Sequence, residues 1–525
     1  MFATRTMFTS LILSLAGIAQ GAVPEAPRVT VRADGTKQLR FDWNYVPRAN
    51  YYELWFRAND GAAPVKFADL PSWRPRATSG VAIHLLNWAQ ARYWVKACNP
   101  SGCTASAPLA VSAALANAIG FEKSSFPLDL AFFGAQLAVS ADGSTLVAAA
   151  PEESNDRNVQ YPIAALYVFT RTGASWRLEA RLAPVPAQIE DGPGLQIAID
   201  ADGSRFIVGM PSYISNSVPQ DDGQALIYER TSAGWRVAQR ITPAGAVATG
   251  EIADIDAAGN TALVGTSYPY GALQIWRRAA SGWSLSGSIP HPGGNATCRR
   301  AALSADGLVI TRACLISGSG EIQVFTGTGW TLRNRIAFAP PAADYDFSGF
   351  AVDRDASTIA AAFARASDSP DSHALVAVFH RTTGEYRRES TFTPGGWFSN
   401  TRSFDAQFGT ALALSPDGRF LAIGHPGDDG AGSGVLAPPL AAGGSPLGAV
   451  YLFERNTAGW KARNVVKPSY LPGRGKGAGF GAAVSFGDAG RTLVIGQPGE
   501  STYVPNPGNE QDEPGGGASG ALWIY

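Results

Sequence analysis

Apolar and polar residues alternate in short runs along almost the whole chain, and turn residues separate the runs. This period of two is typical of β-strands that have one buried and one exposed face. From residue 119 onward, four kinds of run recur in a fixed order. The first kind ends in a turn such as Ser-Ala-Asp-Gly and occurs seven times, at 132–143, 193–203, 250–260, 298–307, 348–357, 408–418 and 480–490.

The second and third kinds of run also occur seven times, but the fourth kind occurs six times. The last run of the third kind ends at Tyr525, and residues 120–126 have the Gly-aromatic, alternating form of the fourth kind. A sheet completed by a distant segment closes a ring and leaves no free edge. The pattern therefore predicts an all-β chain with a seven-bladed β-propeller over residues 116–525, closed by residues 119–126.

Residues 22–115 carry a different set of alternating runs, at 27–33, 38–46, 50–58, 81–86, 92–99 and 103–111. Their spacing is typical of a small β-sandwich. The stretch 109–118 is expected to link the sandwich to the propeller.

The first 21 residues predict export. Arg5 precedes an apolar stretch at 8–19, and Ala19 and Gly21 are the small residues that a signal peptidase accepts. Cleavage near Gly21 is expected, with a secreted, periplasmic or envelope location, and no later apolar stretch is long enough to span a bilayer.

The charge balance narrows the choice of partner. The chain has 42 basic and 43 acidic residues, which favours neither nucleic acid nor an anionic membrane. We expect a monomer without a cofactor that binds a protein or a glycan.

The N-terminal stretch resembles fibronectin type III domains. The resemblance rests on Trp43, on residues 51–54 (YYEL) and on residues 93–99 (YWVKACN) followed by Ser-Gly-Cys. It implies a sandwich whose last hairpin is closed by a disulfide between Cys98 and Cys103.

The repeats resemble the FG-GAP repeats of integrin α-chain propellers and of secreted bacterial proteins. The pattern is Phe-Gly, then a turn, an apolar strand ending in Gly-x-Pro, and Gly-Ala-Val-Tyr-Leu-Phe. The best matches are Phe133-Gly134 with Ala150-Pro151, Phe408-Gly409 with Gly424-His425-Pro426, and Phe480-Gly481 with Gly496-Gln497-Pro498. The Ser-Pro-Asp-Gly turns are also similar to those of periplasmic propellers of the translocation type.

Integrin-type repeats often carry calcium in the first hairpin. Here the hairpins hold pairs of aspartates, Asp200 with Asp202, Asp254 with Asp256 and Asp353 with Asp355. Calcium takes six to eight oxygen ligands, so these pairs do not support a calcium site, and turns capped by aspartate side chains are expected instead.

Two further cysteines, Cys298 and Cys314, flank one of these hairpins. A turn centred on Asp306 pairs Ser304 with Leu308 and, counting outward, Cys298 with Cys314. Directly opposed cysteines on adjacent strands are close enough to bridge, which predicts a disulfide, with two free thiols as the alternative.

Three connections between second and third strands are long, at 151–163, 426–447 and 498–519. Ring closure makes their blades neighbours, so the loops are expected to form one acidic patch. Its candidate ligand-binding residues are Glu152, Glu153, Asp156, Asp428, Asp429, Glu500, Asp512 and Glu513, with Glu510, Tyr161 and Tyr503 nearby. Solvated inserts without a ligand are the alternative.

No nucleophile elbow, zinc-protease motif or phosphate-binding loop occurs, and the five histidines are scattered, so no catalytic residue is predicted. The sequence favours a secreted, non-enzymatic binding or adhesion protein. The alternatives are an extracellular hydrolase or lyase that uses the acidic loop residues, and a structural role in the cell envelope.

Overall fold

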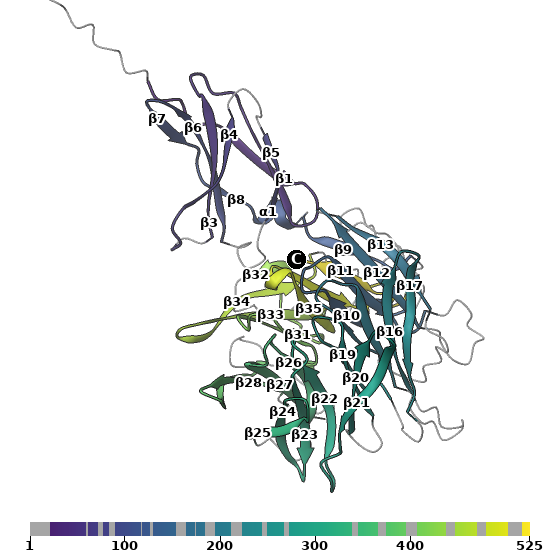
Figure 1. Cartoon of the computed structure of the whole chain (residues 1–525). Helices are drawn as coiled ribbons and strands as arrows, with labels where there is room; N and C mark the ends of the chain where they lie inside the picture. Colours follow the sequence, from purple (N-terminus) through teal and green to yellow (C-terminus); the bar gives the residue numbers. More distant parts are fainter. Residues whose placement is uncertain are drawn as a thin grey trace, which may run out of the picture. The chain divides into compact units, whose positions relative to one another are not determined.

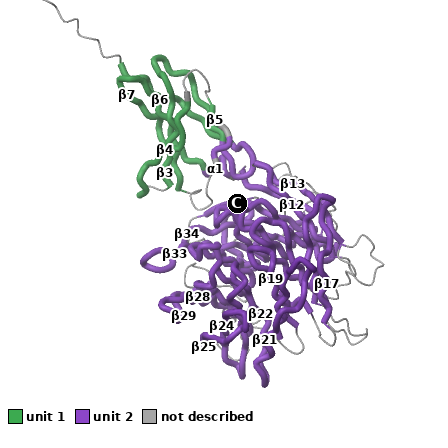
Figure 2. Tube along the Cα trace, in the orientation of Figure 1, with its two compact units in different colours: residues 1–32, 40–79, 90–111 green, residues 33–39, 80–89, 112–525 purple. Residues whose placement is uncertain are grey.

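The computed structural model describes residues 22–58, 61–71, 77–82, 90–116, 118–125, 130–153, 164–173, 175–183, 195–211, 223–243, 249–266, 272–338, 345–365, 374–394, 407–436, 447–469, 479–501 and 517–525. The predicted signal peptide, residues 1–21, lies outside them. The chain divides into two compact units (Figure 2): unit 1 comprises residues 1–32, 40–79 and 90–111, and unit 2 comprises residues 33–39, 80–89 and 112–525.

Two sheets form around the core of unit 1 (Figure 1), and the strands of the second pair antiparallel. The first has the order β1-β2-β5, and the second has the order β4-β3-β6-β7, with β8 beside β6. The bounds are β1 Val29–Ala33, β2 Gln38–Trp43, β3 Tyr51–Arg57, β4 Val65–Pro71, β5 Ala77–Ala82, β6 Arg92–Asn99, β7 Gly102–Ala105 and β8 Leu109–Ala110, followed by the short helix α1 Ser112–Ala116.

The alternation seen in the sequence produces this core directly. Phe41, Tyr52 and Leu54 are at most 2% exposed, and the ring centroids of Phe41 and Tyr93 are 5.1 Å apart. Cys98 lies directly opposite Cys103 across β6 and β7, and the disulfide implied by the family resemblance is formed.

Unit 2 consists of antiparallel sheets, most of them four-stranded. Its described strands are β9 Gly120–Glu122, β10 Gln136–Val139, β11 Thr145–Ala150, β12 Ala165–Thr172, β13 Ser175–Leu182, β14 Gln196–Ile199, β15 Arg205–Met210, β16 Gln224–Thr231, β17 Gly234–Ile241, β18 Ile252–Ile255, β19 Thr261–Thr266, β20 Ala272–Ala279, β21 Gly282–Ile289, β22 Thr297–Leu303, β23 Val309–Ile316, β24 Ser319–Thr326, β25 Thr331–Phe338, β26 Tyr345–Val352, β27 Thr358–Arg365, β28 Leu375–Thr382, β29 Glu385–Phe392, β30 Leu412–Leu414, β31 Phe420–His425, β32 Gly434–Leu436, β33 Ala449–Asn456, β34 Gly459–Lys467, β35 Ala483–Gly487, β36 Thr492–Gln497 and β37 Ala521–Ile524, with a 3₁₀ turn at Asp488–Gly490.

Within the described residues, these strands form the sheets β10–β13, β14–β17, β18–β21, β22–β25, β26–β29, β30-β31-β33-β34-β32 and β35-β36-β37-β9. The first strand of each sheet contacts the first strand of the next, and β35 of the last sheet contacts β10 of the first. A closed succession of small antiparallel sheets is the arrangement of a β-propeller.

The strand predicted upstream of the repeats exists. β9 pairs antiparallel with β37, with Phe121 opposite Trp523, and it is the fourth strand of the last sheet. The two aromatic rings meet edge to face with centroids 4.9 Å apart. Two segments about 400 residues apart in the sequence therefore share one sheet, which protects the edge of β37 from other chains.

Glu122 ends this closing strand in a half-buried position, and burial raises the pKa of its carboxyl to about 7. The folded state therefore binds the proton more tightly than the unfolded state does. Protonation of Glu122 therefore contributes about 3 kcal/mol to the free energy of unfolding below about pH 4.5, and this contribution is lost as the pH rises to about 7.

We expect Glu122→Gln to match the wild type in free energy of unfolding at pH 4 and to exceed it at pH 8. Chemical denaturation at both pH values measures this, and equal stability at pH 8 would contradict it.

The hairpins between first and second strands are tight turns, as predicted. Their aspartates accept hydrogen bonds from nearby backbone amides, such as Ser204 N to Asp202 Oδ1 at 2.9 Å and Thr358 N to Asp353 Oδ1 at 2.9 Å. Asp254 lies in β18 and accepts from Ile255 N at 2.8 Å and from Leu303 N of the next sheet at 2.7 Å. Asp202 and Asp353 thus cap their turns, as the sequence predicted.

Backbone hydrogen bonds link successive turns across the sheets. They run from Asp142 N to Ala201 O, Ala201 N to Ala257 O, Ala257 N to Ala305 O, Ala305 N to Arg354 O, Arg354 N to Pro416 O, and Ala489 N to Ala141 O, at 2.8 to 3.4 Å. Pro416 accepts the bond from Arg354 N and has no N–H of its own to donate. The sequential linkage explains why short turns of similar length recur throughout.

The hairpin of β22 and β23 contains the predicted disulfide between Cys298 and Cys314, but by a different register. Leu303 lies opposite Ile310, so the pairing near the turn differs by one residue from the predicted match of Ser304 with Leu308. A β-bulge between Thr297 and Arg300 then shifts the register back and places the cysteines side by side. The bridge was predicted correctly, and the pairing next to the turn was wrong.

One long connection contains structure that the sequence analysis treated as loop. β32, within the stretch 426–447, pairs antiparallel with β34 and adds a fifth strand to its sheet. Val435 and Leu436 of this strand lie opposite Val466 and Val465. These apolar contacts with β34 stabilise β32 as a strand, although the sequence of its three residues alone does not predict one.

Candidate functional site

Three of the predicted ligand-binding acids occupy one repeated position. Glu153, Asp428 and Glu500 each lie two residues beyond the proline that follows a second strand, β11, β31 or β36. Each is less than 10% exposed. Their sheets are neighbours, because β30 contacts β35 and β35 contacts β10. The expected grouping of these three connections on adjacent sheets is therefore present, and the carboxylates point inward.

Glu153 is bound by two side chains of its own sheet. Tyr167 of β12 donates its hydroxyl to Oε2 at 2.5 Å, and Arg181 of β13 donates to Oε1 at 2.8 Å. Burial, together with the negative charge of Glu153, raises the pKa of Tyr167 to about 12. The tyrosine therefore remains a proton donor throughout the physiological pH range.

Asp428 makes the same set of contacts in its sheet. Lys467 at the end of β34 lies 2.5 Å from Oδ1, Tyr451 of β33 donates to Oδ2, and His425 Nδ1 is 3.5 Å from Oδ2. Burial alone would raise the pKa of Asp428, but the adjacent His425 and the charge of Lys467 outweigh it and hold the pKa well below its usual range. The carboxyl group is therefore ionised and neutralised within the fold.

Glu500 pairs with Lys123, which follows β9, and both side chains are at most 4% exposed. Lys123 also donates to Ser519 Oγ at 2.8 Å, and Gly520 N donates to the backbone oxygen of Glu500 at 2.8 Å. This ion pair joins residues 377 positions apart and fastens the closing strand to the last sheet.

The three acids thus serve as anchors, each paired with a base from the fourth strand of its own sheet or from the residue after it. The carboxylate oxygens of Glu153, Asp428 and Glu500 are bound to their own sheets, and a ligand at these residues stays a prediction. Of the other candidates, Glu152 and Asp429 are partly exposed. Asp156, Asp512 and Glu513, with Glu510, Tyr161 and Tyr503, lie outside the described residues.

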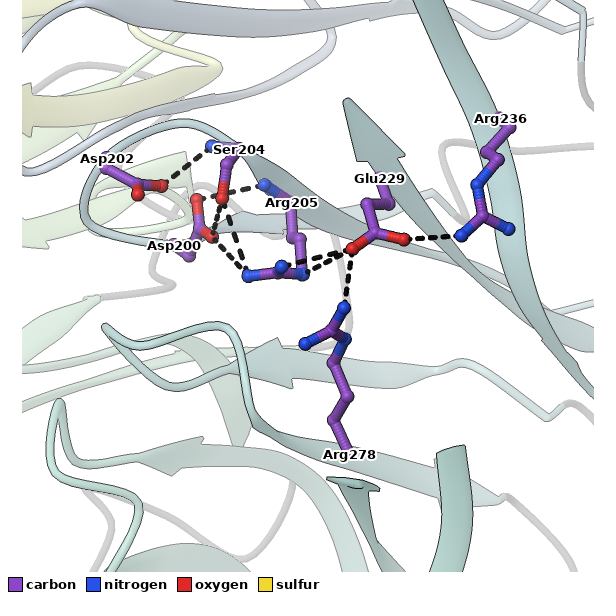
Figure 3. Close-up of polar contacts among 7 residues, drawn as sticks. All are labelled: Asp200, Asp202, Ser204, Arg205, Glu229, Arg236 and Arg278. Atoms are coloured by element: carbon purple, nitrogen blue, oxygen red, sulfur yellow. Dashed lines mark hydrogen bonds and ion pairs between the residues drawn. The ribbon is translucent and has the colours of Figure 1, made fainter. Parts of the chain in front are cut away.

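A second charged cluster was missed from the sequence (Figure 3). Glu229 of β16 binds Arg205 of β15 at 3.0 Å, Arg236 of β17 at 2.7 Å and Arg278 of β20, in the next sheet, at 2.8 Å. Burial opposes ionisation of Glu229, but its three arginines outweigh this effect and lower its pKa. The cluster joins two sheets.

An arginine in the third strand makes this kind of contact at other sheet boundaries. Arg230 binds Glu179 of the preceding sheet at 2.9 Å, and Arg455 binds Glu389 of the preceding sheet at 2.9 Å. An arginine two positions after the aromatic residue recurs in the third-strand runs, such as Tyr-Glu-Arg and Phe-Glu-Arg. That recurrence was the available sequence signal for contacts between sheets.

Metal-ligating residue types come together at one place among the described residues. Glu53, Cys98 and Cys103 have ligand atoms within 4.8 Å of one another, but both sulfurs belong to a disulfide and are not thiolates. This group therefore does not fit a metal ion.

Comparisons with known proteins give no family for this chain. No family model matches, and no curated protein matches. Solved structures with a similar backbone fold include the periplasmic gluconolactonase PpgL of Pseudomonas aeruginosa, with 13% sequence identity and a TM-score of 0.43. The match covers 80% of this chain and 97% of that chain. The β-propeller domain of Cps50 (Swd1) from Myceliophteria_thermophila has 6% identity, coverage of 77% and 99%, and a TM-score of 0.47. At these values the likenesses carry no argument about function.

No helix within the described part of the chain is both long and apolar enough to cross a membrane.

Proposed function

We propose that the chain is a secreted, non-enzymatic binding protein, in which a fibronectin type III-like domain precedes a seven-bladed propeller of the FG-GAP type. The count of described sheets in unit 2 and the pairing of β9 with β37 support the propeller. Two sheets with a disulfide-closed last hairpin support the N-terminal domain. The two disulfides are consistent with an oxidising compartment.

The observation that carries the proposal is the anchoring of three long connections on neighbouring sheets. The ion pairs Glu153–Arg181, Asp428–Lys467 and Glu500–Lys123 hold the start of each connection against its own sheet. Loops that begin from fixed positions on a rigid scaffold are the usual carriers of binding residues. We therefore assign ligand binding to the face formed by these connections, with Glu152 and Asp429 as its described polar residues.

The alternative is hydrolysis by acidic residues of the same loops. Asp428 was one of its expected acids, and its pairing with Lys467 and Tyr451 favours a structural role for that residue. General acid–base catalysis requires a carboxyl within reach of substrate and with a suitable pKa. The binding hypothesis is thus the better supported of the two.

The test is to measure binding of the full protein to immobilised surface glycans and purified envelope proteins, and to follow release of products from the same panel. We expect saturable binding to at least one member, weakened by Asp429→Ala and Glu152→Ala. Lys461→Ala, at an exposed position of β34, is the matched control and leaves binding unchanged. Product release that is lost in Asp429→Ala would replace this proposal with the hydrolytic one.

A further inference from the structure

The outer face of the sheet β4-β3-β6 in unit 1 carries aromatic side chains in an unusual position. Alternation places Tyr52 and Leu54 of β3 in the core, and Tyr51, Glu53 and Trp55 on the opposite face. Trp55 lies directly opposite Trp94 of β6, which is likewise on the outer face because Tyr93 and Val95 are buried. Two tryptophans and a tyrosine thus share the face that the core does not use.

Charged groups of both signs surround these rings. Glu53 accepts a hydrogen bond from Trp55 Nε1 at 2.7 Å and lies 3.4 Å from Lys66 Nζ, which is also 2.9 Å from Asp69. Lys96 Nζ lies 3.8 Å from the ring centroid of Trp55. The polar atoms are therefore arranged around the aromatic rings, and Glu53 fixes the orientation of the Trp55 indole.

A shallow depression of about 460 Å³ adjoins Tyr51, whereas Trp55 and Trp94 are not among its lining residues. It is lined by Tyr51, Glu53, Lys66, Asp69 and Leu70. Tyr51 is 37% exposed, and the side chains of Lys66 and Asp69 are 41% and 64% exposed. The volume is within the range of small-molecule sites, but the lining is more polar than is usual for them, with Tyr51 and Leu70 as its apolar side chains.

We propose that this face binds a neutral polysaccharide. A sugar ring presents polarised C–H groups on its faces and hydroxyls at its rim. The electron-rich faces of tryptophan and tyrosine attract the former, and carboxylate and ammonium groups bind the latter. Tyr51 and Trp94 supply the ring faces, Trp55 carries Lys96 over its own ring, and Glu53, Lys66 and Asp69 supply the polar partners.

The balance of charge selects a neutral ligand. Around the depression, Glu53 and Asp69 offset Lys66 and Lys96, so neither a polyanion nor a polycation is selected there. Arg57 and Arg92 lie opposite each other at the next outward positions of β3 and β6, beyond the two tryptophans. A protein partner would be expected to meet a broad apolar centre free of charged groups. Here ionisable side chains of both signs stand next to the rings.

The site is separate from the loop face of unit 2, so the two proposals can fail independently. The probes are hydroxyethylcellulose, xylan, galactomannan and dextran, and the measurement is retardation of the full protein in gels that contain each one. We expect retardation by at least one of them. Trp94→Ala and Tyr51→Ala should weaken it at least tenfold, whereas Asp429→Ala should leave it unchanged.

Matched variants separate binding from folding. Tyr45→Ala removes a tyrosine that is 57% exposed and outside this face, and it should leave retardation unchanged. Glu53→Gln keeps the size of the side chain and should weaken retardation by altering its hydrogen bonds. Thermal midpoints of all variants establish that they are folded. The proposal is overturned if no probe retards the protein, or if folded Trp94→Ala and Tyr51→Ala variants are retarded like the wild type; the rings then serve only to cover the sheet.

Discussion

Gly496→Ala is expected to lower the free energy of unfolding by more than about 4 kcal/mol or to prevent soluble expression. The reason is that the junction of the last sheet with the first has no room for the added methyl group. A Cβ at Gly496 of β36 would lie 1.9 Å from the backbone oxygen of Gly134. Gly134 has a φ of +87°, and its own Cβ would meet Ala521 O at 2.7 Å, so the backbone at this junction cannot easily withdraw. Soluble yield and chemical denaturation measure the effect.

Two other glycine variants define the cause. Gly424→Ala introduces the same clash one boundary earlier, with Gly481 O at 2.1 Å, and it should destabilise the protein to a similar degree. Gly329→Ala, where no heavy atom lies within 4 Å, should change stability by less than about 0.5 kcal/mol. A Gly496→Ala protein as stable as Gly329→Ala would show that the close approach of the sheets is not required.

Lys123→Met is expected to destabilise the protein by roughly 3–5 kcal/mol, the usual cost of leaving one member of a buried ion pair without its partner. Glu500 would then be 0% exposed without the cation that closes the ring. Replacing both partners removes the unpaired charge, so Lys123→Met combined with Glu500→Gln should recover most of the loss. Denaturation of the two single variants and of the double variant gives the coupling energy.

An exposed arginine provides the control for this pair. Arg335 pairs with Glu321 at 2.5 Å, but its side chain is 56% exposed. Arg335→Met should therefore cost less than about 1 kcal/mol. If Lys123→Met cost no more than Arg335→Met, the Lys123–Glu500 pair would not be what fastens the closing strand.

Phe-Gly and Gly-x-Pro, on which the family resemblance rests, are explained by packing between sheets. Phe133, Phe408 and Phe480 are fully buried. The glycine after the phenylalanine brings its carbonyl oxygen against the glycine of the preceding sheet, as Gly481 does against Gly424. The motif thus indicates how the sheets join and carries no information about a ligand.

Local pattern alone predicted most of the strands, the tight turns and the place of the closing strand, but it missed β4 and β32. These follow from the period of two and from turn residues, which act over a few positions. The position two residues after the proline, acidic in three neighbouring repeats, was also visible in the sequence. The role of these acids was not visible, because the bases that pair with them are distant in the sequence and come close only in the folded chain. Lys123, for example, is 377 positions from its partner Glu500.

The register of β22 and β23 likewise depended partly on local sequence and partly on tertiary structure. The sequence predicted the bridge between Cys298 and Cys314, whereas the bulge that aligns them was decided by the tertiary structure. A bulge adds one residue to one strand, and no local composition distinguishes it from a regular ladder here. Likewise, alternation placed Trp55 and Trp94 on strands, but only strand pairing put them side by side on one face. Local periodicity fixes which side of a strand a residue takes, and long-range pairing fixes what it meets there.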